Sequence, residues 1–358
     1  MHRISGWIAA SLVGGSLVAG VCLAEEPAGR LSDAELVKAL GSWLDERVAA
    51  DEFSGVVLVA KEGKPIFRQA YGYADLGLKV PNRPDTKFNL GSINKMFTRL
   101  AIEQLEEQGK LSLDDTVGRH LPDYPNADVR EKVTIRQLIE HRSGMGDVFT
   151  EKFHGMAKDR IRTVKDAISL FADDPLLFVP GTDQKYSNAG FVVLGAIVEK
   201  VSGEGYYDYV REHVYKPAGM KDTDSYELDA PVPNRAVGYT RDSPYGPAPG
   251  GGRRNNLYIT FLKGSPAGGG YSTVDDLLAF DGALRTGKLF KTPRRIGGIG
   301  IAGGTQGCNA LLEQVDAQYT VIVLANYDPP AAMEVGRKVR GWLGVEDEEE
   351  REGPRRRG

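Results

Sequence analysis

Hydrophobic residues form two kinds of pattern along this chain, and each kind predicts one type of element. In several segments apolar residues recur every three or four positions, the spacing of helices that bury one face. These segments are residues 32–51, 189–201, 273–284 and 330–343. Other segments are short apolar runs rich in β-branched residues, which predict strands. These runs are residues 55–60, 65–73, 309–315 and 319–325, so the predicted strands come from both ends of the chain.

The middle of the chain has a helical pattern with almost no strand signal. Further helices are predicted at residues 92–109, 134–141, 164–171 and 207–214. The whole pattern predicts an α+β fold (an α/β sandwich): an antiparallel sheet flanked by N- and C-terminal helices, with an inserted, mainly helical lobe. We expect a sheet lobe at about 30–90 and 265–343, and a helical lobe at about 91–264. Residues 240–265, rich in Pro, Gly and Arg, form either a mobile cover over a site or a disordered loop.

Both ends of the chain are predicted to lie outside the folded domain. Residues 1–24 have Arg3 near the start, an apolar run, and small residues before Glu25, the pattern of a secretory signal peptide. The alternative is an uncleaved N-terminal membrane anchor. Once a signal peptide is removed, we expect no stable membrane span and an exported protein, periplasmic or secreted. Residues 344–358 are predicted to be a disordered charged tail.

Composition narrows the functional classes. The 45 Lys and Arg residues against 49 Asp and Glu residues give a net charge of −4, so nothing indicates nucleic-acid binding. After loss of Cys22 with the signal peptide only Cys308 remains, which excludes an intramolecular disulfide. The five histidines form no metal-ligand spacing, so we expect no metal and no cofactor.

Candidate chemistry begins with Ser92 and Lys95, at the start of the helix predicted over 92–109. Residues three apart are helical neighbours, so the lysine amine can lie beside the serine hydroxyl. It can accept the serine proton only if its pKa falls from about 10.4 toward 7. A helix beginning at Ser92 also directs free backbone N–H groups outward, where an oxyanion could bind. The alternative is a serine N-cap and a solvated lysine.

A second candidate is the pair Tyr186 and Asn188, just before the helix predicted from Ala189. In an extended segment, side chains two apart project the same way. A phenol beside an ammonium group loses its proton more easily and can act as a base, while an amide can hold Lys95 or bind a substrate carbonyl. The alternative is an Asn188 N-cap beside a packed tyrosine. Tyr124 and Asn126 have the same spacing, but no helix is predicted directly behind them.

The third candidate is the glycine-rich segment 300–307, placed ahead of the strand predicted from Asn309. Glycine lets a backbone approach a ligand closely, so an N–H of this segment could complete an oxyanion hole with that of Ser92. The alternative is that these glycines only form a turn at the entry to the strand.

Taken in order, these motifs resemble the serine β-lactamase and penicillin-binding-protein superfamily, most closely the branch of class C β-lactamases, DD-peptidases and related esterases. Its Ser-x-x-Lys is similar to Ser92–Lys95, its Tyr-x-Asn to Tyr186–Asn188, and its Lys/His-x-Gly to Ile301-Ala302-Gly303. Flanking matches at 133–145, 180–181 and 266–269 extend the resemblance over roughly 30–343.

The resemblance implies a serine hydrolase domain over 25–343 that acts on a small-molecule or peptide substrate without a cofactor. Ser92 would attack a carbonyl, Lys95 and Tyr186 would share the proton transfers, and Asn188 would orient Lys95 and the substrate. Backbone N–H groups of Ser92 and Gly304, with Gly303 beside them, would bind the oxyanion. Water would then release the acyl group.

Two departures from the family pattern modify this expectation. Ile301 stands where the family has Lys or His, so esterase or DD-peptidase-like activity is favoured over efficient β-lactamase activity. The segment 287–300 is shorter than in the family, which predicts a shortened sheet edge. If that edge spoils the oxyanion hole, the alternative is a catalytically weak or inactive binding protein with the same fold. The sequence predicts neither the physiological substrate nor the oligomeric state.

Overall fold

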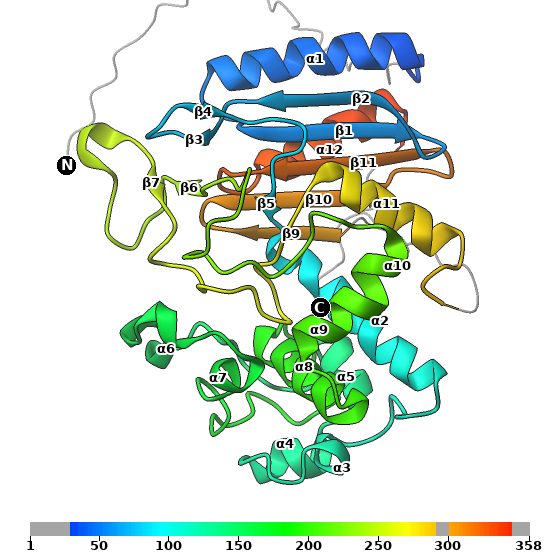
Figure 1. Cartoon of the computed structure of the whole chain (residues 1–358), viewed down its shortest axis with the longest axis vertical. Coiled ribbons are helices and arrows are strands. Elements are labelled where there is room, and N and C mark those ends of the chain that lie inside the picture. The colour runs from blue at the N-terminus through cyan, green and yellow to red at the C-terminus, as the bar shows by residue number, and fades with distance from the viewer. Residues whose placement is uncertain (1–28, 291–300, 346–358) are drawn as a thin grey trace, which may run out of the picture.

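A five-stranded antiparallel sheet forms the centre of the computed structural model, which describes residues 29–290 and 301–345 (Figure 1). The strand order is β2-β1-β11-β10-β9. The strands are β1 (Gly55–Lys61), β2 (Lys64–Tyr71), β9 (Ile301–Thr305), β10 (Cys308–Gln314) and β11 (Tyr319–Ala325). The two predicted strand pairs and the predicted fold class are therefore confirmed.

Strands β1 and β11 join the two ends of the chain in the middle of the sheet. Gly55 pairs with Ala325 and Lys61 with Tyr319, so the register runs along the whole of both strands. A Cβ atom at Gly55 would lie 2.1 Å from the Leu324 carbonyl oxygen, which explains the glycine at this point.

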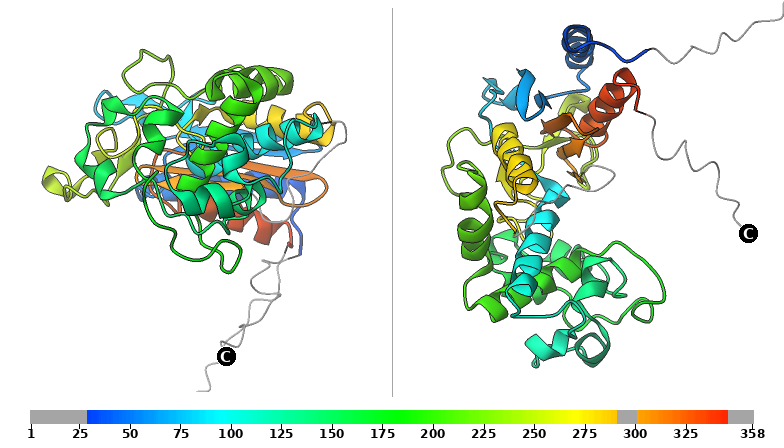
Figure 2. Two further views of the ribbon diagram at one scale, coloured as in Figure 1. Left: turned by 90° about the horizontal axis from the view of Figure 1, so that it is seen from below. Right: turned by 90° about the vertical axis from the view of Figure 1, so that its right-hand side faces the viewer.

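Alternate side chains of the sheet enter two separate hydrophobic clusters. Val57 and Val59 face a cluster with helices α1 (Asp33–Ala49) and α12 (Ala331–Trp342). Val56 and Leu58 face the opposite cluster, which includes helices α2 (Asn94–Glu107) and α11 (Val274–Arg285). Both terminal helices thus cover the same face, and α11 covers the other (Figure 2). Each fully buried aliphatic side chain contributes about 1.5–3 kcal/mol to this packing.

Helices dominate the segment between β5 (Phe88–Asn89) and β6 (Tyr239–Thr240), as the sequence predicts. They are α2, α3 (Val117–His120), α4 (Ala127–Lys132), α5 (Ile135–Ile139), α6 (Glu151–Gly155), α7 (Val164–Ile168), α8 (Asn188–Ser202), α9 (Tyr206–Val210) and α10 (Lys216–Ala218). Short turns of helix are η1 (Gly91–Ile93), η2 (Lys158–Arg160), η3 (Arg211–Tyr215) and η4 (Pro249–Gly251). The remaining short strands are β3 (Tyr73–Asp75), β4 (Val80–Pro81), β7 (Arg254–Asn255) and β8 (Tyr271–Ser272).

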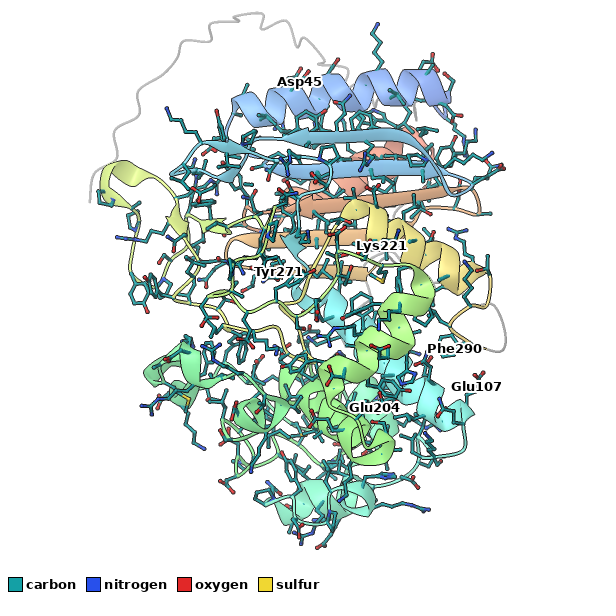
Figure 3. All side chains as sticks on the ribbon, in the orientation of Figure 1. Asp45, Glu107, Glu204, Lys221, Tyr271 and Phe290 are labelled. Atoms are coloured by element: carbon teal, nitrogen blue, oxygen red, sulfur yellow. The ribbon has the colours of Figure 1, made fainter. Side chains whose placement is uncertain are left out.

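Side chains fill the space between the sheet and the helices, and the buried Tyr271 of β8 lies near the centre of the molecule (Figure 3). Strand β8 pairs with β5, directly before the turn that carries Ser92. The sheet side of the molecule and the helical side therefore meet where the candidate nucleophile lies.

The edge of the sheet differs from the prediction. The glycine-rich segment was expected to precede a strand, but its residues Ile301–Thr305 are themselves the edge strand β9. The predicted signal peptide over 1–24, most of the predicted tail and residues 291–300 lie outside the described residues. In the parts of the chain that are described, no helix has the length and apolar character needed to cross a membrane.

Candidate active site

Ser92 lies in the short 3₁₀ turn η1, two residues before α2 begins at Asn94. The helix was expected to begin at Ser92, so the structure corrects its start by two residues. The preceding Gly91 has a positive φ of 50°, and a Cβ atom there would lie 2.8 Å from the Gly304 nitrogen. Only glycine fits this turn, because β9 packs directly against it.

Lys95 points back from α2 toward Ser92, and its side chain is almost completely buried. Its Nζ atom lies 3.2 Å from Ser92 Oγ and 2.6 Å from Asn188 Oδ1, and it also donates to the Ala267 carbonyl oxygen. Burial lowers the pKa of Lys95 to about 7, although the charge of Asp147 acts in the opposite direction. The amine can therefore be neutral, and able to accept a proton, near neutral pH.

Tyr186 reaches Ser92 from the loop before α8. Its hydroxyl donates a hydrogen bond of 2.6 Å to Ser92 Oγ. Lys95 Nζ lies 4.7 Å from the centre of the tyrosine ring. Burial raises the pKa of Tyr186, and the hydrogen bond to Ser92 only partly offsets this. A lowered phenol pKa was expected, so the structure favours a protonated Tyr186 that donates and a neutral Lys95 that accepts.

Asn188 is the first residue of α8, and its amide faces two partners. Oδ1 accepts from Lys95, while Nδ2 donates to both carboxylate oxygens of Asp147 at 3.0 and 2.9 Å. The alternative of an Asn188 N-cap is wrong, because Ser187 caps the helix by accepting from the Gly190 N–H at 3.0 Å. The Asn188 side chain is therefore available to orient Lys95.

Gly303 and Gly304 bring the edge strand β9 against the serine turn. A Cβ atom at Gly303 would lie 2.0 Å from the Leu90 carbonyl oxygen and 2.8 Å from the Ser92 nitrogen. Strand β9 pairs only with β10 in the described sheet, so alternate N–H groups of β9 face away from that partner. A Cβ atom at Gly91 would lie 2.8 Å from the Gly304 nitrogen, so the backbone nitrogens of Ser92 and Gly304 belong to the same close contact between η1 and β9, where two donors could share one oxyanion.

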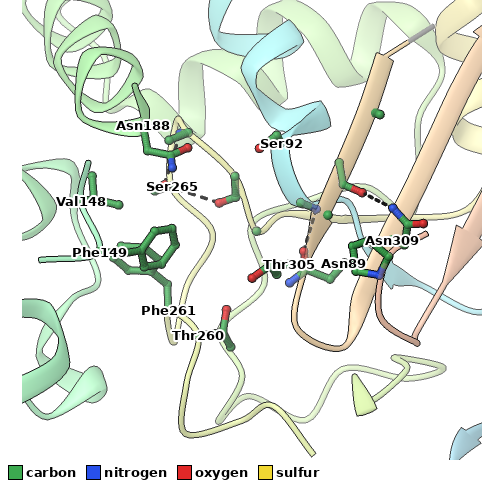
Figure 4. A pocket seen from close by; sticks show the side chains of 18 of the residues that line it. Asn89, Ser92, Val148, Phe149, Asn188, Thr260, Phe261, Ser265, Thr305 and Asn309 are labelled. Atoms are coloured by element: carbon green, nitrogen blue, oxygen red, sulfur yellow. Dashed lines mark hydrogen bonds between the residues drawn. The ribbon is translucent and has the colours of Figure 1, made fainter. Parts of the chain in front are cut away.

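A pocket of about 440 Å³ opens beside Ser92 (Figure 4). Its apolar lining includes Val148, Phe149, Ile259, Phe261 and Met333. Its polar lining includes Asn89, Asn188, Thr260, Thr305 and Asn309. The rings of Phe149 and Phe261 lie 5.5 Å apart between centroids and form an aromatic wall. Residues 259–261, from the loop predicted as either a cover or a disordered segment, are thus part of the pocket wall.

Sequence reasoning missed two residues next to the site, His141 and Asp147. The His141 ring stacks on the Tyr186 ring, with 4.6 Å between centroids, and its Nδ1 accepts from the Ser187 N–H at 3.1 Å. Burial, together with the Lys95 charge, lowers the pKa of His141 to about 4. His141 lies within the match at 133–145 and Asp147 follows it by two residues, but neither belongs to a hydrophobic period or to one of the three catalytic motifs. The match at 133–145 was the only signal that could have pointed to them.

The other tyrosine with the same spacing, Tyr124, is not part of this arrangement. Its side chain is buried, and its hydroxyl has no hydrogen-bond partner among the described residues. Within residues 29–290 and 301–345, no cluster of three or more His, Cys, Asp or Glu side chains could hold a metal ion. The groups that the structure brings together around Ser92 are the Lys95 amine, the Tyr186 phenol and the Asn188 amide.

Comparison with known proteins gives consistent matches. The family model described as Beta-lactamase matches residues 40–306. Penicillin-binding protein 4* of Bacillus subtilis is 34% identical over 241 residues, which are 65% of this chain and 52% of that protein. The chain thus spans about half the length of the curated relatives it matches.

Two solved structures resemble the whole fold. A penicillin binding protein from Bacillus halodurans is 29% identical, with a TM-score of 0.71 over 82% of this chain and 97% of that one. EstCE1, described as a hydrolase with promiscuous acyltransferase activity, is 25% identical, with a TM-score of 0.69 over 87% of this chain and 99% of that one.

Proposed function

The chain belongs to the beta-lactamase family, and from this membership we propose that it is an exported serine hydrolase that forms an acyl-serine intermediate on a small ester, amide or peptide. One observation carries the proposal: Ser92 Oγ lies within hydrogen-bonding distance of both the Tyr186 hydroxyl and the Lys95 amine. A serine hydroxyl needs such a neighbouring acceptor to become nucleophilic.

In the acylation step, the neutral Lys95 amine takes the Ser92 proton as Oγ attacks the substrate carbonyl carbon. Tyr186 donates its proton toward the leaving group, and the Lys95 ammonium returns a proton to the phenolate. The raised pKa of Tyr186 and the lowered pKa of Lys95 support this assignment of donor and acceptor. Asn188 holds the amine toward the serine throughout, through the hydrogen bond from Lys95.

The carbonyl oxygen becomes an oxyanion as the tetrahedral intermediate forms. We assign its stabilisation to the backbone N–H groups of Ser92 and Gly304, with Gly303 permitting the close approach of β9. Donors fixed in advance in this way lower the barrier because they need no reorganisation during the reaction. Water, activated by the same Lys95 and Tyr186 pair, then attacks the acyl-serine and releases the acid.

The pocket lining supports uncharged substrates over carboxylates. None of the described residues that line the pocket has a charged side chain, and an aromatic wall stands opposite the polar groups. Ile301 occupies the position where the family has a cation, so a substrate carboxylate lacks that partner. Esterase or DD-peptidase-like activity is proposed in preference to efficient β-lactamase activity, and of these two the uncharged lining favours the esterase, because a DD-peptidase substrate ends in a carboxylate.

Covalent labelling of the purified chain tests the proposal. Fluorophosphonate is expected to label the wild type and not Ser92→Ala. As a matched control, Ser169→Ala removes an exposed hydroxyl at the end of α7 and is expected to label normally. Labelling by fluorophosphonate but not by a fluorescent penicillin indicates an esterase. No labelling by either reagent overturns the proposal and indicates a binding protein with this fold.

A further inference from the structure

We propose that Asp147 is a positioning residue of this site: its carboxylate fixes the Asn188 amide so that Oδ1 faces Lys95, and its charge tunes how readily Lys95 gives up a proton. The inference rests on the proposed function of Ser92 and Lys95. Its geometric basis is a continuous chain of contacts from Asp147 through Asn188 to the amine.

Asp147 is itself held in place. Its Oδ1 accepts from the backbone N–H of Val148 at 2.7 Å and of Phe149 at 3.2 Å. The same two residues line the pocket. Because the carboxylate is anchored to the backbone on one side, it presents a fixed pair of acceptors to Asn188 Nδ2 on the other. An amide whose NH₂ is held in this way can turn only its oxygen toward Lys95.

The contact between Asp147 and Asn188 is one of several between residues 141–147 and residues 186–188. His141 stacks on Tyr186 and accepts from Ser187, the Ser187 hydroxyl donates to the Gly146 carbonyl oxygen at 2.8 Å, and Asp147 accepts from Asn188. Residues 141–147 therefore contact each residue of the Tyr186–Asn188 motif in turn. In this series of contacts, Asp147 is the residue that binds the Asn188 side chain.

The charge of Asp147 matters because the other described groups that face Lys95 are neutral or are neutral near pH 7. From η1 there is Ser92, from the loop at 265–268 the Ala267 carbonyl, and from α8 the Asn188 amide and the Phe191 ring. The titratable neighbours are His141 and Tyr186. The pKa of His141 is lowered to about 4 and the pKa of Tyr186 is raised, so both side chains are uncharged near pH 7. A carboxylate beside them favours the ammonium form of Lys95.

The test is the pKa of Lys95 itself, read by NMR titration of the full chain labelled with ¹³C-lysine, with the Lys95 signal assigned by its loss in Lys95→Met. Asp147→Asn is expected to lower this pKa by on the order of one unit. The double variant Asp147→Asn/Asn188→Asp moves the carboxylate next to the amine and is expected to raise the pKa above that of the wild type. This rise would show that the Lys95 signal responds to the position of the carboxylate, so an unchanged pKa in Asp147→Asn could not be ascribed to an insensitive probe.

Asp183→Asn is the matched control, because Asp183 is an exposed carboxylate in the same loop as Tyr186 and accepts only from its neighbour Gln184 among the described contacts. It is expected to leave the Lys95 pKa unchanged. Equal shifts in Asp147→Asn and Asp183→Asn, or no shift in Asp147→Asn, overturn the inference. The titration needs no turnover, so a chain that fails to react with fluorophosphonate disproves the proposed function while still testing the role of Asp147. In an active chain, the acid limb of kcat/KM for Asp147→Asn moves to lower pH by the same amount.

Discussion

The Tyr186 hydroxyl lies 2.6 Å from Ser92 Oγ although 94 residues separate the two in the chain. The serine comes from the turn before α2 and the tyrosine from the loop before α8, so the contact depends on the packing of these two helices. Lys95 completes the arrangement from the first turn of α2. A hydroxyl between a donor phenol and an acceptor amine is prepared to lose its proton in one direction only, toward the amine.

Removing the phenol oxygen should slow the reaction without unfolding the chain. Tyr186→Phe keeps the ring that lies against His141 and Lys95 but deletes the proton donor. We expect kcat/KM on a neutral ester to fall about 10²–10⁴-fold, the usual contribution of a general acid or base. Tyr124→Phe is the control: it deletes a buried hydroxyl that has no partner in the described part of the chain and should leave kcat/KM unchanged. Equal activity of the two variants would contradict the role of Tyr186.

Activity should rise with pH through the pKa of Lys95. The reactive form of Lys95 is neutral, and its pKa is about 7, so kcat/KM is expected to be low at pH 5 and to reach a plateau above about pH 8. The plateau should persist into the alkaline range, because the pKa of Tyr186 is raised and the phenol keeps its proton. Lys95→Arg, which stays protonated at every accessible pH, should be inactive throughout. A profile that falls as pH rises from 6 to 8 would exclude Lys95 as the base.

A single methyl group on β9 should separate the edge strand from the serine. In Gly303→Ala the new Cβ would meet the Leu90 carbonyl oxygen at 2.0 Å, which no side-chain adjustment can relieve. We expect the rate of fluorophosphonate labelling to fall at least about 10²-fold as the oxyanion donors move apart. In Gly282→Ala the new Cβ has no atom of a described residue within 4 Å. That variant should label normally and gain about 0.5–1 kcal/mol of stability from its place in helix α11.

Stability should depend on a buried carboxylate remote from the pocket. Asp281 of α11 is 2% exposed and accepts from Arg285, from Thr320 and from Gln314. Asp281→Ala leaves these donors without their acceptor, and we expect a loss of about 3 kcal/mol in the free energy of unfolding, measured in urea. Asp128→Ala, which breaks the exposed pair with Lys132, should change stability by less than about 0.5 kcal/mol. The labelling rate of folded Asp281→Ala should match that of the wild type.

The parts of the site that depend on local spacing could be predicted from the sequence. Ser92 and Lys95 are neighbours on one helical turn, and the terminal strands and helices follow clear hydrophobic periods. The direction of the shift in the Tyr186 pKa could not be predicted, because the shift depends on burial by segments that are distant in the sequence. Strand β9 was missed because glycine has low strand propensity, and its extended form is held by pairing with β10 and packing on η1. The places of His141 and Asp147 could not be predicted either, because their contacts with residues 186–188 join two loops that have no periodic sequence pattern.

The pairing of β1 with β11 also has a consequence for the order of events during synthesis. A ribosome would finish Ser92, Lys95, Tyr186 and Asn188 long before residues 319–325 emerge to join the two halves of the sheet. Strand β9, with its glycines, becomes part of that sheet through β10, which pairs with β11 in turn. A nascent chain would therefore hold all four reactive groups from residue 188 onward without strand β9, and would gain catalytic competence only once residues 301–325 have been added.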